Sequence, residues 1–246
     1  MQKTKIEWTD YIWNPIKGLC PVDCKLPDGQ SYCYARRMYQ RFKWNPEMRF
    51  ELHDPMAIDR LYRKNIPDGS KVFVCSTFEL FHPKVPKSWR KIIFDVVKLN
   101  PKIIFQILTK FPQNIDRPMP DNVWLGVSIT KPIEMYPKIK SLYQAQTKLK
   151  FVSFEPLMGD VGQFRFQGWL RQNFDWIIVG RLTGYGHKHD PKDYWITSLI
   201  YHAKAFKTPI FLKNNLKEIW GEPLIQEFPI STKYKFIGGK SNELSE

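Results

Sequence analysis

The sequence predicts an α/β fold in which six or seven parallel strands alternate with helices, arranged as an open or incomplete (β/α) barrel. Short apolar runs bounded by turn residues recur along the 246 residues. They are apolar nearly throughout, which is typical of strands covered on both faces. Helical patterns fill most of the gaps, as crossovers between parallel strands require. A doubly wound sheet is the alternative, although the chain lacks a glycine-rich dinucleotide fingerprint.

The predicted strands are short and rich in Val, Ile and Phe, which suits a buried pleated surface. A run over 11–16 is a weaker candidate, because Pro15 cannot donate a hydrogen bond to a neighbouring strand. The six stronger candidates cover residues 71–77, 102–109, 123–129, 150–156, 175–180 and 209–214.

Four helices are predicted from amphipathic patterns and start signals. The runs over 54–65 and 190–207 both open with Asp-Pro, which places a capping carboxylate before a first-turn proline. The run over 87–100 gathers its apolar residues on one stripe, and the run over 34–42 follows three cysteines. Residues 109–123 are too rich in proline for a good helix and predict a loop or a single turn.

A single domain over residues 1–230 accounts for these elements, with a cysteine loop at 18–35 and a C-terminal tail over 231–246. No window approaches eighteen consecutive apolar residues, so we expect no membrane span. The first ten residues lack the apolar centre of a secretion signal, which predicts a cytoplasmic protein.

The chain is strongly basic. It has 38 Lys and Arg against 24 Asp and Glu, a formal net charge of +14. This balance favours a polyanionic partner, nucleic acid first. A generally basic surface is the alternative, because many of the lysines are scattered along the chain.

Three of the four cysteines lie within fourteen residues, at Cys20, Cys24 and Cys33. In the cytosol such a cluster is more often metal-binding or catalytic than a disulfide framework. Three thiolates from one irregular loop can hold three irons of a [4Fe–4S] cluster, and the fourth iron stays open for another ligand. Cys75 lies in an apolar run and is predicted to be a core residue.

A zinc site competes with the iron–sulfur interpretation. Structural zinc usually takes four ligands in two close pairs, whereas the spacing here is Cys-x3-Cys-x8-Cys. Cys75, Asp23 or His82 could supply a fourth ligand. His187 and His189 form a second candidate metal pair, without a third ligand in the sequence.

Polar side chains follow the predicted strands, where sites collect in parallel α/β folds. They are Ser76, Thr77, Glu79 and His82, then Thr109 and Lys110, Ser128 and Thr130, Glu155, Arg181 and Thr183, and Lys213 and Asn214. For each of them, a hydrogen bond within the rim of the sheet is the structural alternative to a site role.

The cysteine loop resembles that of radical S-adenosylmethionine enzymes, whose usual pattern is Cys-x3-Cys-x2-Cys with an aromatic before the last cysteine. Cys20 and Cys24 match the first spacing, and Tyr32 stands in the aromatic position before Cys33. The stretch KLPDGQ is then a six-residue insertion in the second spacing.

A closer resemblance covers nearly the whole chain. The motifs KIEWTDYIWNPIKGLC, CYARRM, STFELFHPKVP, FQILTKFPQNI, NVWLGVSIT, FVSFEPLMGDV and DWIIVGRLTGYG resemble an uncharacterised three-cysteine family of phages and mobile elements. That family is related to the spore photoproduct lyase-like branch of the radical S-adenosylmethionine enzymes. The resemblance implies a partial TIM-like (β/α) barrel of six or seven units.

The chain departs from this family at one motif, where Gly-Gly-Glu is usual and the sequence reads GRLTG. Arg181 replaces a glycine and Leu182 replaces the glutamate. If that carboxylate binds cofactor or substrate, then either Glu155 or Glu79 compensates for its loss or the site has diverged.

The resemblance implies that Cys20, Cys24 and Cys33 hold a [4Fe–4S] cluster whose open iron chelates S-adenosylmethionine. Reductive cleavage then releases a 5′-deoxyadenosyl radical, which abstracts hydrogen from a substrate. The resemblance also implies roles in binding S-adenosylmethionine and the substrate. Tyr32 would lie near the adenine, Ser76 and Thr77 would contact the amino-acid end, and Ser128 would bond the ribose. Glu155 would bond the ribose or the substrate, and phosphate or carboxylate groups would be bound by Lys110, Arg181 and Lys213.

A nucleic acid or nucleotide is the expected substrate, because bases stack on aromatic rings and phosphates meet cations. A reductant such as flavodoxin or ferredoxin is the expected electron-donating partner. The alternative is a non-catalytic module, stabilised by zinc or a cluster, that binds nucleic acid or a partner protein encoded nearby. Leu182 and the stretched cysteine spacing favour this alternative.

Overall fold

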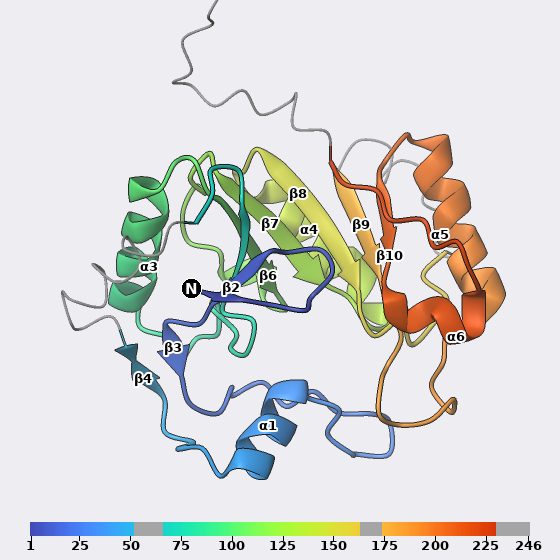
Figure 1. Ribbon diagram of the computed structural model, residues 1–246, viewed down its shortest axis with the longest axis horizontal. Helices are drawn as coiled ribbons and strands as arrows, with labels where there is room; N and C mark the ends of the chain where they lie inside the picture. Colours follow the sequence, from blue (N-terminus) through green and yellow to red (C-terminus); the bar gives the residue numbers. More distant parts are fainter. Residues whose placement is uncertain (52–65, 163–173, 230–246) are drawn as a thin grey trace, which may run out of the picture.

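The fold is taken from a computed structural model that describes residues 1–51, 66–162 and 174–229. Its centre is an eight-stranded sheet in the order β1-β2-β5-β6-β7-β8-β9-β10 (Figure 1). Every neighbouring pair from β2 to β10 is parallel, and β1 pairs with β2 in the antiparallel direction. A second, two-stranded sheet joins β3 to β4.

The strands of the large sheet are β1 (Gln2–Lys3), β2 (Tyr11–Trp13), β5 (Lys71–Val74), β6 (Ile104–Thr109), β7 (Val123–Ser128), β8 (Leu149–Phe154), β9 (Trp176–Val179) and β10 (Ile210–Leu212). The small sheet is β3 (Ile16–Lys17) and β4 (Arg49–Phe50). The central strands are buried on both faces, which explains their continuous apolar sequences.

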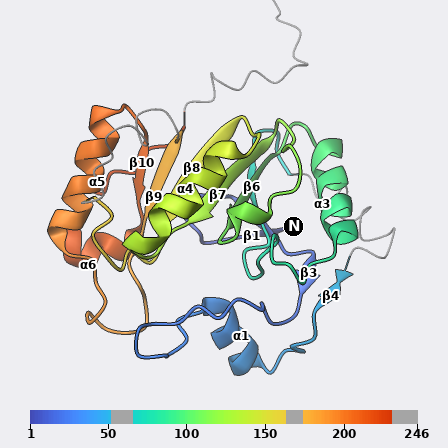
Figure 2. The same ribbon diagram turned by 180° about the vertical axis from the view of Figure 1, so that it is seen from behind.

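Three helices cover one face of the sheet (Figure 2). They are α3 (Lys87–Leu99), α4 (Met135–Gln144) and α5 (Asp193–Ala205), and each contributes buried side chains to the main hydrophobic core. The shorter helices are α1 (Tyr34–Phe42) and α6 (Lys217–Trp220). In Figure 1, α1 and the chain leading to it lie beyond the carboxyl ends of the strands.

The parallel α/β prediction is confirmed, and each predicted strand has a counterpart in the sheet. The strand order follows the chain without reversal, so the doubly wound alternative is wrong. The predicted helices 34–42, 87–100 and 190–207 correspond to α1, α3 and α5. The proline-rich segment holds one short turn, η2 (Pro112–Asn114), as predicted.

Two predictions cannot be followed in the same way. The predicted helix over 54–65 and the tail over 231–246 lie outside the described residues. The sheet is open, with β1 and β10 at its edges, so the fold is a mostly parallel α/β sheet, and its description as a partial (β/α) barrel stays a prediction.

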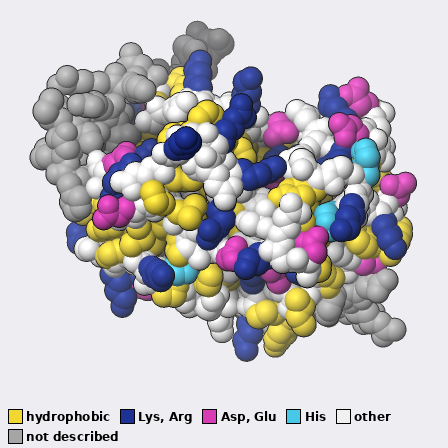
Figure 3. All heavy atoms as spheres, turned by 90° about the horizontal axis from the view of Figure 1, so that it is seen from below, with side chains coloured by type: hydrophobic (Ala, Val, Ile, Leu, Met, Phe, Trp, Pro, Cys, Tyr) yellow, Lys and Arg dark blue, Asp and Glu magenta, His cyan; other side chains and the backbone are white. Residues whose placement is uncertain are grey.

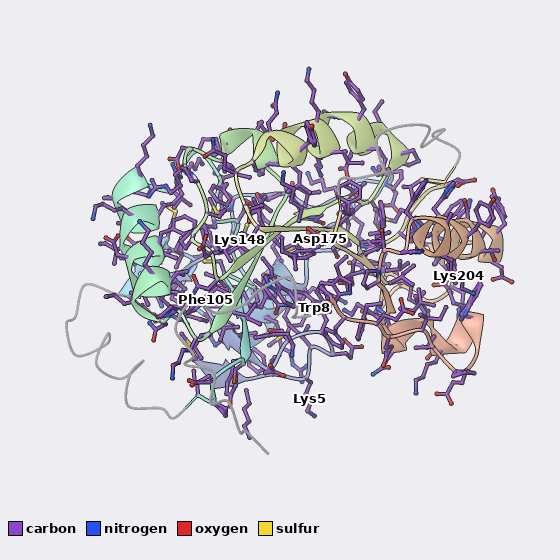
Figure 4. The ribbon with its side chains drawn as sticks, turned by 90° about the horizontal axis from the view of Figure 1, so that it is seen from above. Lys5, Trp8, Phe105, Lys148, Asp175 and Lys204 are labelled. Atoms are coloured by element: carbon purple, nitrogen blue, oxygen red, sulfur yellow. The ribbon has the colours of Figure 1, made fainter. Side chains whose placement is uncertain are left out.

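The sheet curves around one aromatic side chain, Trp8. The rings of Phe73 on β5 and Trp176 on β9 lie 4.8 and 6.2 Å from the Trp8 ring. Those strands are four positions apart, which would separate them by about 19 Å in a flat sheet. Figure 4 looks down on the sheet from above and labels Trp8 near the middle of the molecule. The curvature therefore brings strand ends that are distant in the sheet order toward one another.

A second hydrophobic cluster forms around Trp8 on this face, with side chains from five strands: Phe73, Trp124, Leu149, Phe151, Trp176, Ile178 and Phe211. The cluster fills the amino-terminal part of the curved face, whereas polar side chains follow toward the carboxyl ends. In the described parts of the chain, no helix has the length and apolarity that crossing a bilayer requires.

Trp8→Ala should lower the free energy of unfolding by about 3–5 kcal/mol, because it removes a buried ring that contacts several strands. Urea unfolding followed by circular dichroism measures this loss. Leu99→Ala, at an exposed position on α3, is the control and should change the value by less than about 0.5 kcal/mol. A loss of similar size in both variants would contradict the role assigned to Trp8.

Candidate functional site

The cysteine loop crosses the carboxyl edge of the parallel sheet. Near its start, the N–H of Gly18 donates to the Tyr39 hydroxyl of α1 at 2.7 Å. At its end, Tyr32 is hydrogen-bonded to Thr130, which follows β7. The Tyr185 hydroxyl, in the loop after β9, donates to the Ser31 carbonyl at 2.5 Å. Figure 1 shows the two loops meeting below the strands.

Local sequence explains why this loop is irregular. Gly29 has a φ of +85°, a backbone region that strongly favours glycine, and its N–H donates to the Leu26 carbonyl at 3.0 Å. The turn is closed by a bridge between Lys25 and Ser31. The six residues that lengthen the cysteine spacing therefore form a compact turn, which returns the chain to Cys33.

Cys24 and Cys33 form a hydrogen-bonded pair. This bond lowers the pKa of the Cys33 thiol to about 6, against the effect of burial, and the N–H groups of Ala35 and Arg36 assist. The same bond and burial raise the pKa of Cys24. Cys20 is buried, which raises its pKa, and it interacts electrostatically with Cys33. The three thiols thus share one neighbourhood, and Cys33 ionises first.

Within the described residues, no group of three or more His, Cys, Asp and Glu side chains is arranged to hold a metal ion. This finding gives no support to a preformed metal site, whether for zinc or for an iron–sulfur cluster. In an iron–sulfur cluster the thiolates bind through separate irons, so the three-thiol donor set fits that group by its chemistry.

The other candidate metal ligands have different surroundings. Cys75 is buried in the main core, as predicted, and burial raises its pKa. Asp23 forms an ion pair with Lys25 at 2.7 Å. The His82 ring packs against Phe111, with centroids 5.3 Å apart. His187 pairs with Asp190 at 2.7 Å on the exposed loop after β9.

Lys110 lies directly after β6 and is surrounded by acidic groups. Its Nζ donates to the Ser128 hydroxyl at 2.9 Å. Burial alone would lower its pKa, but Tyr32, Cys24 and other acidic groups reverse the effect and raise it. Lys110 therefore keeps a positive charge beside the cysteine loop, where it would stabilise added negative charge.

A second cation, Lys213 after β10, forms an ion pair with Glu155 after β8. Glu7 lies 3.9 Å from the same ammonium group. Gly180, after β9, leaves the space for this pair, because a Cβ there would lie 3.0 Å from Cδ of Lys213. Burial opposes the charge on Lys213, but the nearby carboxylates outweigh it and raise the pKa.

Glu79 is buried and links two strand ends. Its carboxylate accepts hydrogen bonds from the Thr109 hydroxyl at 2.5 Å and the Lys110 N–H at 2.8 Å. Burial raises its pKa above the ordinary value of a glutamate. These hydrogen bonds occupy the Glu79 carboxylate and link the ends of β5 and β6. Glu155 is therefore more accessible than Glu79.

The structure therefore gathers Tyr32, Lys110 and Ser128 on one side of the strand ends, and Glu155 and Lys213 on another. We call these five residues and the three loop cysteines the carboxyl-edge site. Two further predicted residues lie after β5: Ser76, whose hydroxyl donates to the Asn14 side chain at 3.1 Å, and half-buried Thr77.

Arg181 is engaged inside the protein. Its guanidinium pairs with Asp190 at 2.8 Å and also with Glu218, and the side chain is buried. Leu182, the next residue, is buried as well. The phosphate-binding role expected of Arg181 stays a prediction, and these ion pairs would have to open for it.

The sequence analysis did not identify Ser153 or Glu134. Ser153 pairs in register with Ser128, is fully buried, and its hydroxyl has no hydrogen-bond partner among the described residues. Glu134 accepts from the Thr130 N–H at 2.7 Å and lies near Lys110. The available signal for Ser153 was a hydroxyl within an otherwise apolar strand.

In metal-free protein, Cys33 should react with iodoacetamide at neutral pH, because its thiolate predominates above its pKa of about 6. Its rate should rise between pH 5 and 7 and then level off. Peptide mass spectrometry measures the rate at each cysteine, with buried Cys75 as the unreactive control. A Cys33 rate that rises only near pH 9 would contradict the Cys24–Cys33 pairing.

Comparisons with known proteins place this geometry in context. The structure is similar to that of a double mutant of spore photoproduct lyase with bound AdoMet and dinucleoside spore photoproduct, with a TM-score of 0.52 and 10% identity. The match covers 81% of this chain and 64% of that chain, and it shows a shared fold. No curated protein matches the sequence. A family model described as a protein of unknown function (DUF5131) matches residues 3–233, so the chain belongs to the DUF5131 family.

Proposed function

We propose that this protein is a radical S-adenosylmethionine-type enzyme whose cysteine loop holds a [4Fe–4S] cluster. The observation that carries the proposal is that one loop brings three cysteines to the carboxyl edge of a parallel sheet, where their thiols interact electrostatically. The same edge carries the Lys110–Ser128 hydrogen bond, the Lys213–Glu155 ion pair and the buried Ser153 hydroxyl, which has no hydrogen-bond partner among the described residues. The fold similarity to a lyase with bound AdoMet supports the same conclusion.

The cysteines would bind as thiolates, so loading must remove their protons. Cys33 starts with a low pKa, and the charge of Lys110 favours ionisation of Cys24. A [4Fe–4S] cluster held by Cys20, Cys24 and Cys33 would supply an open iron and the electron for reductive cleavage of S-adenosylmethionine. The protein's own residues would orient that molecule and the substrate and keep water away.

The site offers partners for the polar groups of S-adenosylmethionine. Tyr32 lies beside Cys24 and Lys110 and would pack near the adenine. The unpartnered hydroxyl of Ser153, next to Ser128, would bond a ribose hydroxyl or a substrate polar group. Ser76 and Thr77 are placed after β5, where they would meet the amino-acid end.

Glu155 is the carboxylate that we propose compensates for the leucine at position 182. It is less buried than Glu79 and is paired with Lys213, which can exchange one partner for another. Glu155 would accept hydrogen bonds from an ammonium or hydroxyl group, and the freed Lys213 would meet a carboxylate or phosphate.

We propose a nucleic acid or nucleotide as the substrate. The net charge of +14 attracts a polyanion, and the structurally similar lyase was solved with a dinucleoside product bound. We place the protein in the cytoplasm, where thiols stay reduced, with flavodoxin or ferredoxin as the electron donor. We propose a partner protein encoded nearby only for the case in which the isolated chain shows no activity.

A second candidate function is a cluster-stabilised binding module without turnover. The burial of Leu182 and the internal pairing of Arg181 favour it, because both residues replace members of the family motif. Protein that holds iron but never cleaves S-adenosylmethionine would support this candidate.

Cys20→Ala, Cys24→Ala and Cys33→Ala should each lose most bound iron after anaerobic reconstitution, because each removes one of three thiolate ligands. Wild-type protein should be brown and hold about four irons per chain. Cys75→Ala is the matched control and should keep its iron. Colourless wild-type protein with one zinc, or loss of iron in Cys75→Ala alone, would overturn the ligand assignment.

Glu155→Gln should slow the formation of 5′-deoxyadenosine by about 10- to 100-fold while iron content stays the same, because it removes one charged hydrogen-bond acceptor. Chromatography of the products after addition of S-adenosylmethionine and dithionite measures the rate. Glu222→Gln, an exposed change that opens an ion pair with Lys217, is the control. Equal rates in the two variants would remove Glu155 from the site.

A further inference from the structure

The outer face of α1 and the residues that end it expose three large aromatic side chains. Tyr34, Phe42 and Trp44 keep 60%, 49% and 48% of their surface exposed. Phe42 and Trp44 are stacked, with ring centroids 5.4 Å apart and an interplanar angle of 21°. Flat rings held in this way at the surface, outside the core, are typical of a binding surface.

Cations lie between these rings. Arg37 and Arg41 share the face of α1 that carries Tyr34, since they follow it by three and seven residues, and Lys43 ends the helix. The Arg41 guanidinium lies over the Phe42 ring, 5.3 Å from its centroid. We call Tyr34, Phe42, Trp44, Arg37, Arg41 and Lys43 the α1 platform.

The α1 platform carries uncompensated positive charge. Residues 29–46 contain four basic side chains and no Asp or Glu. Among the residues that the structure describes, Arg37, Arg41 and Lys43 form no ion pair. Figure 3 views the molecule from below and shows hydrophobic side chains interspersed with Lys and Arg on this face.

The α1 platform adjoins the carboxyl-edge site. Tyr34 directly follows Cys33, a proposed cluster ligand. The Arg37 guanidinium lies 5.5 Å from the centre of the Tyr185 ring, and Tyr185 bonds the cysteine loop at Ser31. A chain molecule bound along α1 would therefore reach the loops that border the site.

We propose that the α1 platform binds single-stranded nucleic acid and directs it to the carboxyl-edge site. Unpaired bases stack on Tyr34, Phe42 and Trp44, and phosphates meet Arg37, Arg41 and Lys43. In a single-stranded nucleic acid, bases that stack on rings alternate with phosphates that bind cations, and the α1 platform offers both kinds of partner. An acidic polypeptide would interact with the cations alone. The inference rests on the proposed function and names its substrate class and docking surface.

Fluorescence anisotropy with a labelled twelve-residue deoxythymidine oligomer tests the inference on the full chain. Trp44→Ala and Phe42→Ala should each weaken binding about tenfold, because each removes a stacking surface. Arg41→Gln should reduce the slope of log affinity against log salt concentration by about 0.7. Tyr201→Ala, an equally exposed aromatic on α5, is the control and should bind like the wild type.

Two comparisons use wild-type protein alone and so do not depend on the folding of a variant. An abasic oligomer of the same length should bind at least tenfold more weakly, and poly-glutamate more weakly still. Equal affinity for the abasic oligomer or poly-glutamate, or unchanged affinity in both Trp44→Ala and Phe42→Ala, would overturn the inference. Oligomer binding at the α1 platform does not require iron, and the iron content is measured separately on the same preparation. Protein that binds the oligomer but holds no iron would contradict the proposed function and not this inference.

Discussion

The packing of strand side chains around Trp8 is the constraint on which the rest of the structure depends. The Trp8 ring packs against rings from β5 and β9, strands four positions apart in the sheet, and a flat sheet could not make both contacts. Because parallel strands point the same way, curving their surfaces also draws together the residues that follow them. The charges after β6, β8 and β10 lie along the same carboxyl edge of the sheet, and one short loop can reach from β3 to residues after β7 and β9.

The chemistry at that edge follows from burial. Burial alone would lower the pKa values of Lys110 and Lys213, and the acidic groups around them raise these values instead. Such networks are costly to assemble and are typical of sites that bind polar ligands. The Ser153 hydroxyl, which has no hydrogen-bond partner in the part of the chain that the structure describes, fits the same pattern, since a bound molecule would satisfy it.

Much of the fold could be predicted from the sequence, because buried parallel strands have continuous apolar sequences. The helix α4 was not predicted, although Pro137 lies in its first turn, where proline is tolerated. The two-residue strands β1, β3 and β4 are too short to show any period. Within the site, the cysteines, Lys110 and Glu155 could be predicted from their residue types and their positions in the sequence. The pairing of Arg181 with Glu218, thirty-seven residues later, depends on tertiary contact and leaves no local signal.

The central claim is that three thiolates hold a cluster with one iron open to a small molecule. Electron paramagnetic resonance of the anaerobically reduced protein tests it most directly, with and without S-adenosylmethionine. The account predicts the signal of a reduced [4Fe–4S] cluster and a clear change in that signal when S-adenosylmethionine is added, because the open iron gains a ligand. A signal that S-adenosylmethionine leaves unchanged, or no cluster signal in fully reconstituted protein, would contradict it.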